Sequence, residues 1–510
     1  MVQKGQTRVA VVGSGMAGLV TAYLLHRDIQ SRYAVTIFEG VRIATPPVHV
    51  LGTVPADVPQ GNVLSLDSAS LTIESPSRGH ADRVDLPMRA FAGGFYTNLK
   101  AMYDYLGVEY HSQPFLFSFS KAAAPSARST HGEKGSSYFI HSSNNHRIPP
   151  VRPEGISTAA WSLEILYLLV CYTWFSACCF FVEPRLASKK NVCETFDEYL
   201  RRIRLPQYFV TYYLLPLISS VTTCSHKALL CFPAADVTEY RRRTHRAHHY
   251  TVSHGVQDVQ RKLAEGIPTN LSAMVSSVGI QHSGVKISWR DTEDTRSLTT
   301  HEDLFDRVIL AVSPDVVGKI FRSLQYEMAQ IPTASVESIV HADYDNLGEW
   351  PGQLGGQNLC HTAAHTIHLR TSTEGIHRTE SIHVQPSGAL VTTCPFGYID
   401  PVHIVKLSRF TRVLRTPESR RVVNSIFSDH TSIEEIDGEK PRPRWKNGDE
   451  NVWLVGGWCW DGPQKPSTSK SHGETRALGR FIMTNGVTSQ YVELNNVPHA
   501  SLNVVCSIKH

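Results

Sequence analysis

The sequence has little of what marks several common classes of protein. Its net charge is only +4 over 510 residues, and neither end carries a run of like charges, so charge gives no indication of nucleic-acid binding. The 10 cysteines form no C-x-x-C pair and have no regular spacing, which is typical of reduced thiols. No secretory signal is visible, because the first apolar run is broken by glycines. We therefore expect a cytoplasmic protein without a nucleic-acid partner.

Support for a metal site is also weak. His361 and His365 have the i, i+4 spacing that can place two zinc ligands on one helix face. The segment around them is rich in threonine, contains no H-E-x-x-H motif and has no cysteine pair to complete a ligand set. We expect no bound metal.

The strongest signal is a glycine-rich stretch near the start of the chain. Residues 8–12 form a short apolar run of the kind buried in a parallel sheet, and Gly13, Gly15 and Gly18 follow in G-x-G-x-x-G register. Residues 16–26 are predicted to form a helix, whose first amides would face a diphosphate. A second strand at 33–38 ends on Glu39, the position at which an acid holds a ribose hydroxyl.

This combination predicts dinucleotide binding. The alternative is an ordinary glycine-rich turn between a strand and a helix. Strand, turn, helix, second strand and terminal acid all occur in the required order, which favours the dinucleotide site.

A chain of this length is too long for one simple core, so we expect two domains, in tandem or interleaved. Residues 165–182 are 18 consecutive residues without a charge, a length at the threshold for a membrane span. Three interpretations stay open: a buried helix of a substrate domain, a helix at a membrane surface or at the entry of a hydrophobic substrate, and a true span.

A second group of signals follows the middle of the chain. The spacing of apolar residues predicts a helix at 255–264, paired strands at 271–278 and 285–289, and a buried strand at 306–312. The period of residues 404–412 fits a helix or a strand. Near the end, residues 451–462 form an apolar strand that breaks at Gly456 and Gly457, where the backbone can approach a ligand or form a bulged strand end.

Together these segments resemble one family. They are VAVVGSGMAGLVTAYLL, DLPMRAFAGGFYTNLKAMYDYLGV, YLLPLISSVTTCSHKALLCFPA, HGVQDVQRKLAEGI and VWLVGGWCW. In this order they resemble the FAD-dependent flavin amine oxidase-like oxidoreductases, in the NAD/FAD-binding branch common in fungi and bacteria. The resemblance implies an α/β fold, in which a Rossmann-type FAD-binding domain contains an inserted α+β substrate domain.

The resemblance also implies domain boundaries. The FAD-binding domain would consist of residues 1–110, 251–320 and 446–462, and the substrate domain of residues 111–250 and 321–445. The remaining residues, 463–510, depart from the family pattern. Where the family continues into an apolar helix this chain reads PQKPSTSKSHGETRALG, so we expect a divergent, disordered tail. A second departure is at Arg42, which Ile43 follows where the family has glycines.

Site residues follow from the resemblance position by position. The diphosphate of FAD would lie against the glycine loop and the ribose against Glu39, while Val275 would lie beside adenine. Arg89 would pass the flavin ring, and the late glycine pair would lie beside the flavin end. The implied cofactor-binding set is Gly13, Ser14, Gly15, Met16, Ala17, Gly18, Glu39, Arg89, Val275, Gly456, Gly457 and Trp458.

The function implied is transfer of a hydride from a hydrophobic organic substrate to FAD, with oxygen or another acceptor taking the electrons. The apolar residues 165–182 and 205–233 favour a lipid or secondary-metabolite intermediate as substrate. Alternatives are an NAD(P)-dependent dehydrogenase and a non-catalytic flavin- or membrane-binding relic. No pair of nucleophile and base can be identified, so we assign no catalytic residue.

Overall fold

The structure is a computed structural model, and it describes a large part of the chain. The described residues are 5–40, 42–43, 61–62, 64–65, 70–74, 81–86, 90–122, 137–142, 152, 155–187, 192–292, 299–344, 347, 365–372, 375–427 and 445–460.

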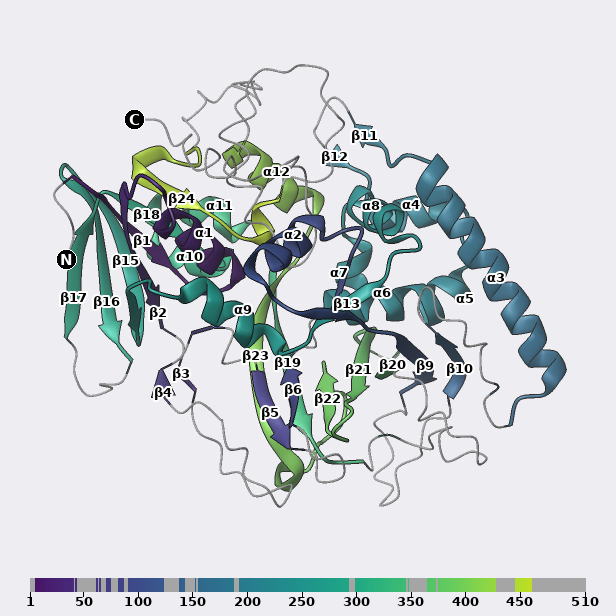
Figure 1. The fold of residues 1–510 in the computed structure, drawn as a ribbon. Helices are drawn as coiled ribbons and strands as arrows, with labels where there is room; N and C mark the ends of the chain where they lie inside the picture. Colours follow the sequence, from purple (N-terminus) through teal and green to yellow (C-terminus); the bar gives the residue numbers. More distant parts are fainter. Residues whose placement is uncertain are drawn as a thin grey trace.

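A five-stranded parallel sheet is built from three widely separated pieces of the chain (Figure 1). Its strand order is β14 (Thr269–Leu271), β2 (Tyr33–Glu39), β1 (Thr7–Val12), β18 (Arg307–Leu310) and β24 (Val452–Leu454). Neighbouring strands pair in parallel throughout. The predicted strands at 8–12, 33–38 and 306–312 are thereby confirmed.

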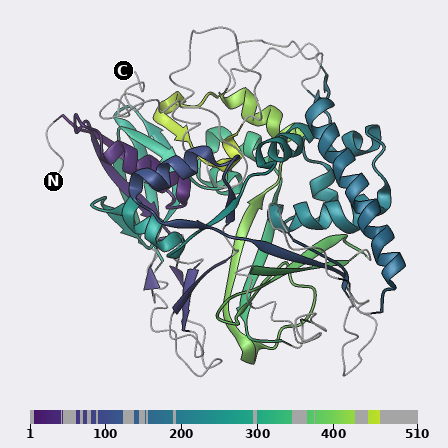
Figure 2. The same cartoon turned by 45° about the vertical axis from the view of Figure 1, so that its right-hand side comes forward.

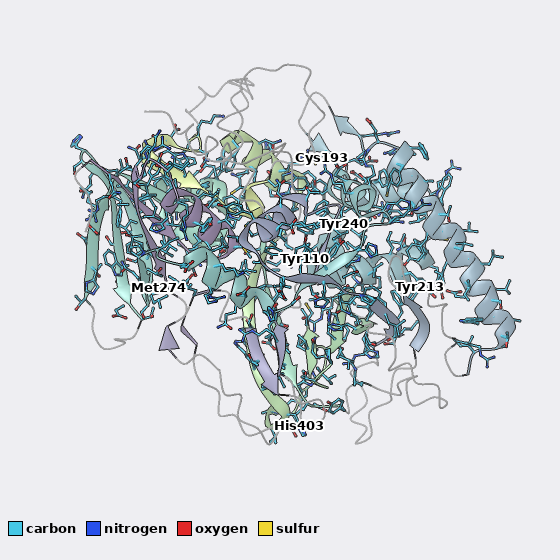
Figure 3. All side chains as sticks on the ribbon, viewed as in Figure 1. Tyr110, Cys193, Tyr213, Tyr240, Met274 and His403 are labelled. Carbon is cyan, nitrogen blue, oxygen red and sulfur yellow. The ribbon has the colours of Figure 1, made fainter. Side chains whose placement is uncertain are left out.

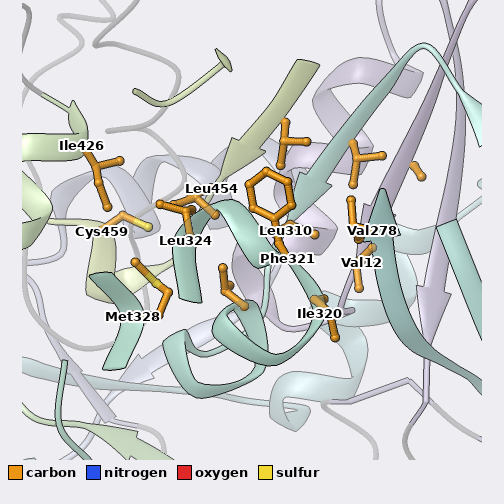
Figure 4. Packing of buried hydrophobic residues seen from close by; sticks show 14 of the residues in the cluster. Val12, Val278, Leu310, Ile320, Phe321, Leu324, Met328, Ile426, Leu454 and Cys459 are labelled. Carbon is orange, nitrogen blue, oxygen red and sulfur yellow. The ribbon is translucent and has the colours of Figure 1, made fainter. Parts of the chain in front are cut away.

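Helices cover both faces of this sheet, which explains its apolar strands. On one face α1 (Met16–His26), α2 (Thr97–Leu106) and α9 (Gly255–Ala264) pack against Val9 and Val11. On the other, α10 (Pro314–Ile320), α11 (Gln325–Ala329) and α12 (Pro417–Phe427) pack against Val12 and Leu310 (Figure 4). The predicted helices at 16–26 and 255–264 match α1 and α9.

Beside the sheet lies an antiparallel unit of β15 (Ala273–Gln281), β16 (Gly284–Asp291) and β17 (Thr300–Phe305). The predicted pairing of residues 271–278 with 285–289 is confirmed. The third strand was not predicted, because its residues, THEDLF, lack an apolar run. Three of its six side chains are exposed and two are only partly buried.

A second, seven-stranded sheet forms the inserted domain (Figure 2). Its order is β10 (Ser137–Ser142), β9 (Phe115–Lys121), β20 (His365–Ser372), β21 (Arg378–Val384), β22 (Leu390–Thr393), β19 (Thr333–His341) and β23 (Ile404–Val413). Only β9 and β20 pair in parallel. Residues 404–412, whose period was ambiguous, are a strand because they pair along most of β19.

Helices from the middle of the chain cover one face of this second sheet. They are α3 (Thr158–Phe181), α4 (Phe196–Arg202), α5 (Gln207–Phe209), α6 (Leu215–Thr222), α7 (His226–Leu230) and α8 (Ala234–Thr244). A β5–β6 ribbon (Ser70–Glu74, Ala81–Asp85) packs through Leu71 and Val84 against Val340 and Val391 of the same sheet.

Short strands complete the described fold. Strand β13 (His249–Val252) lies between β7 (Ala90–Ala92) and β8 (Tyr110–Ser112), and so links the two domains. Two further pairs are β3 (Arg42–Ile43) with β4 (Gly61–Asn62), and β11 (Leu186–Ala187) with β12 (Val192–Cys193). The expected fold class, a Rossmann-type α/β domain with an inserted α+β domain, is confirmed.

Candidate functional site

The carboxyl ends of the parallel strands meet at one edge of the sheet. Val12 of β1 is in register with Phe38 of β2 and with Leu310 of β18, and Leu310 is in register with Leu454 of β24. The residues that follow this row therefore leave the sheet together. In open α/β sheets, ligands bind outside the carboxyl ends of the strands.

The first and third glycines hold the loop after β1 close to its neighbours. Gly13 has φ +101°, and a Cβ there would lie 2.8 Å from the carbonyl oxygen of Ala311. A Cβ on Gly18 would overlap the carbonyl oxygen of Gly13. Both positions therefore exclude a side chain, because the loop is packed between α1 and the end of β18.

Gly15 differs from the other two glycines. A Cβ at this position would meet nothing within 4 Å, so its surroundings are open. It is the N-cap of α1, and no side chain caps the helix. The first amides and the positive end of the helix dipole thus lie at an open, glycine-lined surface, which fits a diphosphate.

The remaining residues of the loop have structural roles. The side chains of Met16 and Ala17 are buried in the core between α1 and the sheet, so only their backbone can face a ligand. The amide of Ser14 donates to Oε2 of Glu39 at 2.8 Å, and its hydroxyl donates to the same oxygen at 2.6 Å. Ser14 therefore fixes the Glu39 carboxylate beside the glycine loop.

Glu39 ends β2, and the start of β15 lies next to it. Leu271 of β14 pairs with Glu39, and a Cβ on Gly40 would lie 3.0 Å from Cα of Met274. Met274 is labelled in Figure 3 near the start of β15. Val275 follows it and packs, partly buried, against the core that includes Phe38. The predicted ribose and adenine residues are thus brought to the same end of β2.

The late glycine pair lies at the same edge of the sheet. The amide of Val455 donates to the carbonyl of Leu310 at 3.1 Å, and Trp458 donates from Nε1 to the carbonyl of Val312 at 3.0 Å. A Cβ on Gly13 would lie 2.9 Å from Cγ1 of Val312. The glycine loop, the end of β18 and the turn at Gly456 and Gly457 are therefore contiguous.

Sequence reasoning missed a buried ion pair next to this turn. Arg415 donates from Nε to Oδ2 of Asp236 at 2.7 Å and from Nη1 to the carbonyl of Trp460 at 2.9 Å. Its guanidinium lies 4.6 Å from the centre of the Trp460 ring. The pair joins α8 to the end of the third piece. The only sequence signal was the presence of two acids, Asp236 and Glu239, at the end of the largely apolar residues 205–240.

Among its described residues, the inserted domain holds four buried histidines whose pKa is lowered by burial. Burial lowers the pKa of His226 and His341 to about 4, and that of His368 and His383 to about 3. Hydroxyl groups bond three of them: Thr379 bonds His226, Thr392 bonds His341 and Ser118 bonds His368. These imidazoles are therefore neutral at physiological pH.

Arg89 and the tail at 463–510, both predicted from the sequence, lie outside the described residues. His361 also lies outside them, and His365 is on strand β20, not on a helix. Within the part of the chain that the structure describes, no three His, Cys, Asp or Glu side chains gather into a metal-binding group.

Comparison with known proteins supports the dinucleotide-binding loop. A family model for an NAD(P)-binding Rossmann-like domain matches residues 11–42, from the end of β1 to just beyond Glu39. No curated protein sequence matches the chain.

Two solved structures are among those similar to this chain at low sequence identity. One is a CLA-producing fatty acid isomerase from P. acnes, with 12% sequence identity, a TM-score of 0.46, and coverage of 89% of this chain and 94% of that one. The other is a protein assigned as a protoporphyrinogen oxidase from Exiguobacterium sp. 255-15, with 11% identity, a TM-score of 0.45 and the same coverage.

Proposed function

Starting from a Rossmann-type domain with an inserted α+β domain, we propose that this protein is an FAD-dependent oxidoreductase that takes a hydride from a hydrophobic organic substrate. The observation that carries the proposal is the return of β24 to the sheet, which brings Gly456 and Gly457 to the edge where the glycine loop lies.

This return favours FAD over NAD(P). A two-domain NAD(P)-dependent dehydrogenase needs the glycine loop and the acid after β2, but no third piece of chain beside them. Here a turn without side chains lies two strands away from the glycine loop, on the far side of β18. The indole of Trp458 covers the side of Gly456 where a Cβ would lie, at 3.0 Å, and we infer that the flavin end of the cofactor lies beside this turn, opposite to Glu39.

The roles of the chain's own residues follow from their positions. The amides at the start of α1, from Gly15 onward, would hold the diphosphate through backbone hydrogen bonds. The Glu39 carboxylate, fixed by Ser14, would accept hydrogen bonds from a ribose. The chemistry that FAD supplies when bound is acceptance of a hydride.

The inserted domain supports a hydrophobic substrate. The core beneath its helices is rich in large apolar side chains, including Phe209, Tyr213 and Phe175. A lipid or secondary-metabolite intermediate is the class of substrate that this composition fits, with oxygen or another acceptor completing the reaction.

The test is a spectrum of the purified protein with its extracted cofactor identified. We expect the flavin absorption band near ~450 nm and FAD in the extract. Gly15→Val should abolish this band while the protein stays folded, because its side chain enters the open space for the diphosphate. Gly279→Val is the matched control, since a Cβ there also meets nothing within 4 Å.

Each other result has a definite meaning. A colourless protein that releases a nicotinamide dinucleotide would replace the proposal with an NAD(P)-dependent dehydrogenase. A yellow protein whose band no candidate apolar substrate bleaches in the absence of oxygen would indicate a non-catalytic relic. Equal loss of the band in both glycine variants would contradict the assigned role of Gly15.

A further inference from the structure

The outer face of α3 is apolar and exposed from Leu163 to Trp174, and the helix ends in the exposed Phe180 and Phe181. Along the helix, an i, i+3 or i, i+4 stripe of apolar side chains points away from the protein. Its exposed members are Leu163 (67%), Leu166 (57%), Leu169 (63%), Val170 (60%), Trp174 (52%) and Phe181 (86%). Figures 1 and 2 both show α3 at the outer edge of the inserted domain.

The inner face of the same helix packs against the rest of the inserted domain. Leu168, Cys171 and Phe175 are buried in the core of the inserted domain. Glu164 accepts hydrogen bonds from Tyr208 and Tyr213, so the one acid within the helix is turned towards the protein. A spanning arrangement would separate these side chains from the core of the inserted domain, so the packing favours a helix that lies on a membrane over one that crosses it.

Cations are spaced along the exposed stripe. Arg152 donates to the hydroxyl of Thr158 at the first turn of α3, and Arg185 is exposed just beyond its last turn. Midway, Trp174 donates from Nε1 to the carbonyl of Ile203, which places the exposed Arg204 beside the stripe. The exposed acids nearby are Glu183, next to Arg185, and Glu198, which accepts hydrogen bonds from Thr195. The partly buried Asp197 is paired with Arg201.

We propose that the outer face of α3 docks on the surface of a lipid bilayer that contains anionic lipids, with the helix lying parallel to the membrane plane. Apolar side chains flanked by arginines are what an interfacial helix presents to acyl chains and to anionic headgroups. Trp174 and the half-exposed Tyr208 supply the aromatic rings that favour the interface.

Charge favours a membrane over a second copy of the chain. A two-fold pair of α3 helices would bring Arg152 against Arg185 if antiparallel, and each arginine against its own copy if parallel. Both arrangements place like charges together, whereas anionic headgroups would neutralise them. This proposal does not depend on the cofactor.

The experiment is co-sedimentation of the full chain with vesicles of phosphatidylcholine containing about 30% phosphatidylserine. We expect the wild type to bind, and the combined variant Leu166→Gln, Val170→Gln and Phe181→Gln to bind at least about 100-fold more weakly. The control variant, Tyr326→Gln, Ile376→Gln and Val402→Gln, changes three equally exposed apolar side chains elsewhere and should bind like the wild type.

A charge variant distinguishes binding to anionic lipids from non-specific hydrophobic adsorption. Arg152→Gln with Arg185→Gln should weaken binding about fivefold for each cation removed, whereas Arg290→Gln with Arg322→Gln, both exposed on the other domain, should not. Thermal unfolding checks that every variant is folded.

Two results would overturn the proposal. One is a wild type that stays in solution with these vesicles, or an apolar variant that binds them as well as the wild type. The other is a dimer, detected by light scattering without lipid, that the apolar variant alone dissociates; this would show that a second copy covers the face. The flavin band, read in the same samples, tests the proposed function independently.

Discussion

The two largest sheets that the structure describes use their interiors differently. In the parallel sheet, the buried rows are almost entirely Val, Ile, Leu and Ala, and the proposed cofactor site beyond them is lined mainly by glycine and backbone. In the seven-stranded sheet, buried Ser, Thr and His side chains alternate with apolar ones and bond to each other across strands. We therefore expect added side-chain volume to destabilise the domain of the parallel sheet. We expect protonation of the buried histidines to destabilise the seven-stranded sheet.

The largest effect is expected from adding volume to the parallel sheet domain. Gly18→Val would force a side chain into the carbonyl of Gly13 and should cost about 4 kcal/mol or more of folding free energy. Soluble yield and thermal unfolding measure it, with Gly15→Val as the comparison that keeps the fold. A Gly18→Val protein as stable as the wild type would show that the loop is not packed in this way.

The next effect is acid destabilisation of the inserted domain. Its four buried histidines have a folded pKa of about 3 or 4, below their ordinary value of 6.5. Their neutral state therefore contributes stability fully above pH 6.5, and this is lost as the pH falls towards the folded pKa values. The slope is about 1.4 kcal/mol per pH unit for each histidine.

Amide hydrogen exchange at a series of pH values separates the two domains. Protection of β20 and β21 should fall between pH 6.5 and about 4 before that of β1 and β2 does. His383→Leu should make this pH dependence shallower, whatever it does to stability at neutral pH. Loss of protection in both sheets over the same pH range would contradict the expected difference in their acid sensitivity.

A smaller effect should follow from breaking the buried ion pair between Arg415 and Asp236. Arg415→Met leaves the buried Asp236 with Arg420 as its nearest cation, at 4.0 Å, and should cost about 3 kcal/mol. Arg421→Met, which removes an exposed pair with Glu418, should cost less than about 1 kcal/mol. Chemical denaturation measures both, and equal costs would mean that burial of the Arg415 pair has no energetic consequence.

The smallest effect should come from the outer face of α3. Leu168 is 4% exposed and its neighbour Leu169 is 63% exposed, so the two are a matched pair. We expect Leu168→Ala to cost about 3 kcal/mol and Leu169→Ala less than about 0.5 kcal/mol in unfolding experiments without lipid. A large cost for Leu169→Ala would show that its side chain is covered by the protein itself.

Sequence patterns predicted the local elements near the glycine loop accurately. The apolar run, the three glycines and the helix spacing are short-range features, and α1 occupies the residues predicted for it. The same approach missed β17 and could not assign residues 404–412, because these strands are stabilised by cross-strand pairing and not by a pattern of their own.

By itself, the sequence determined the positions at which the backbone carries no side chain, because the absence of a Cβ is a property of each glycine alone. It also determined the uncharged length of residues 165–182. Only the tertiary structure decided that β24 lies beside β18, that Arg415 meets Asp236, and that one face of α3 is exposed. These features depend on contacts between residues far apart in the chain, and no local pattern specifies which distant partner a strand or a charge will find.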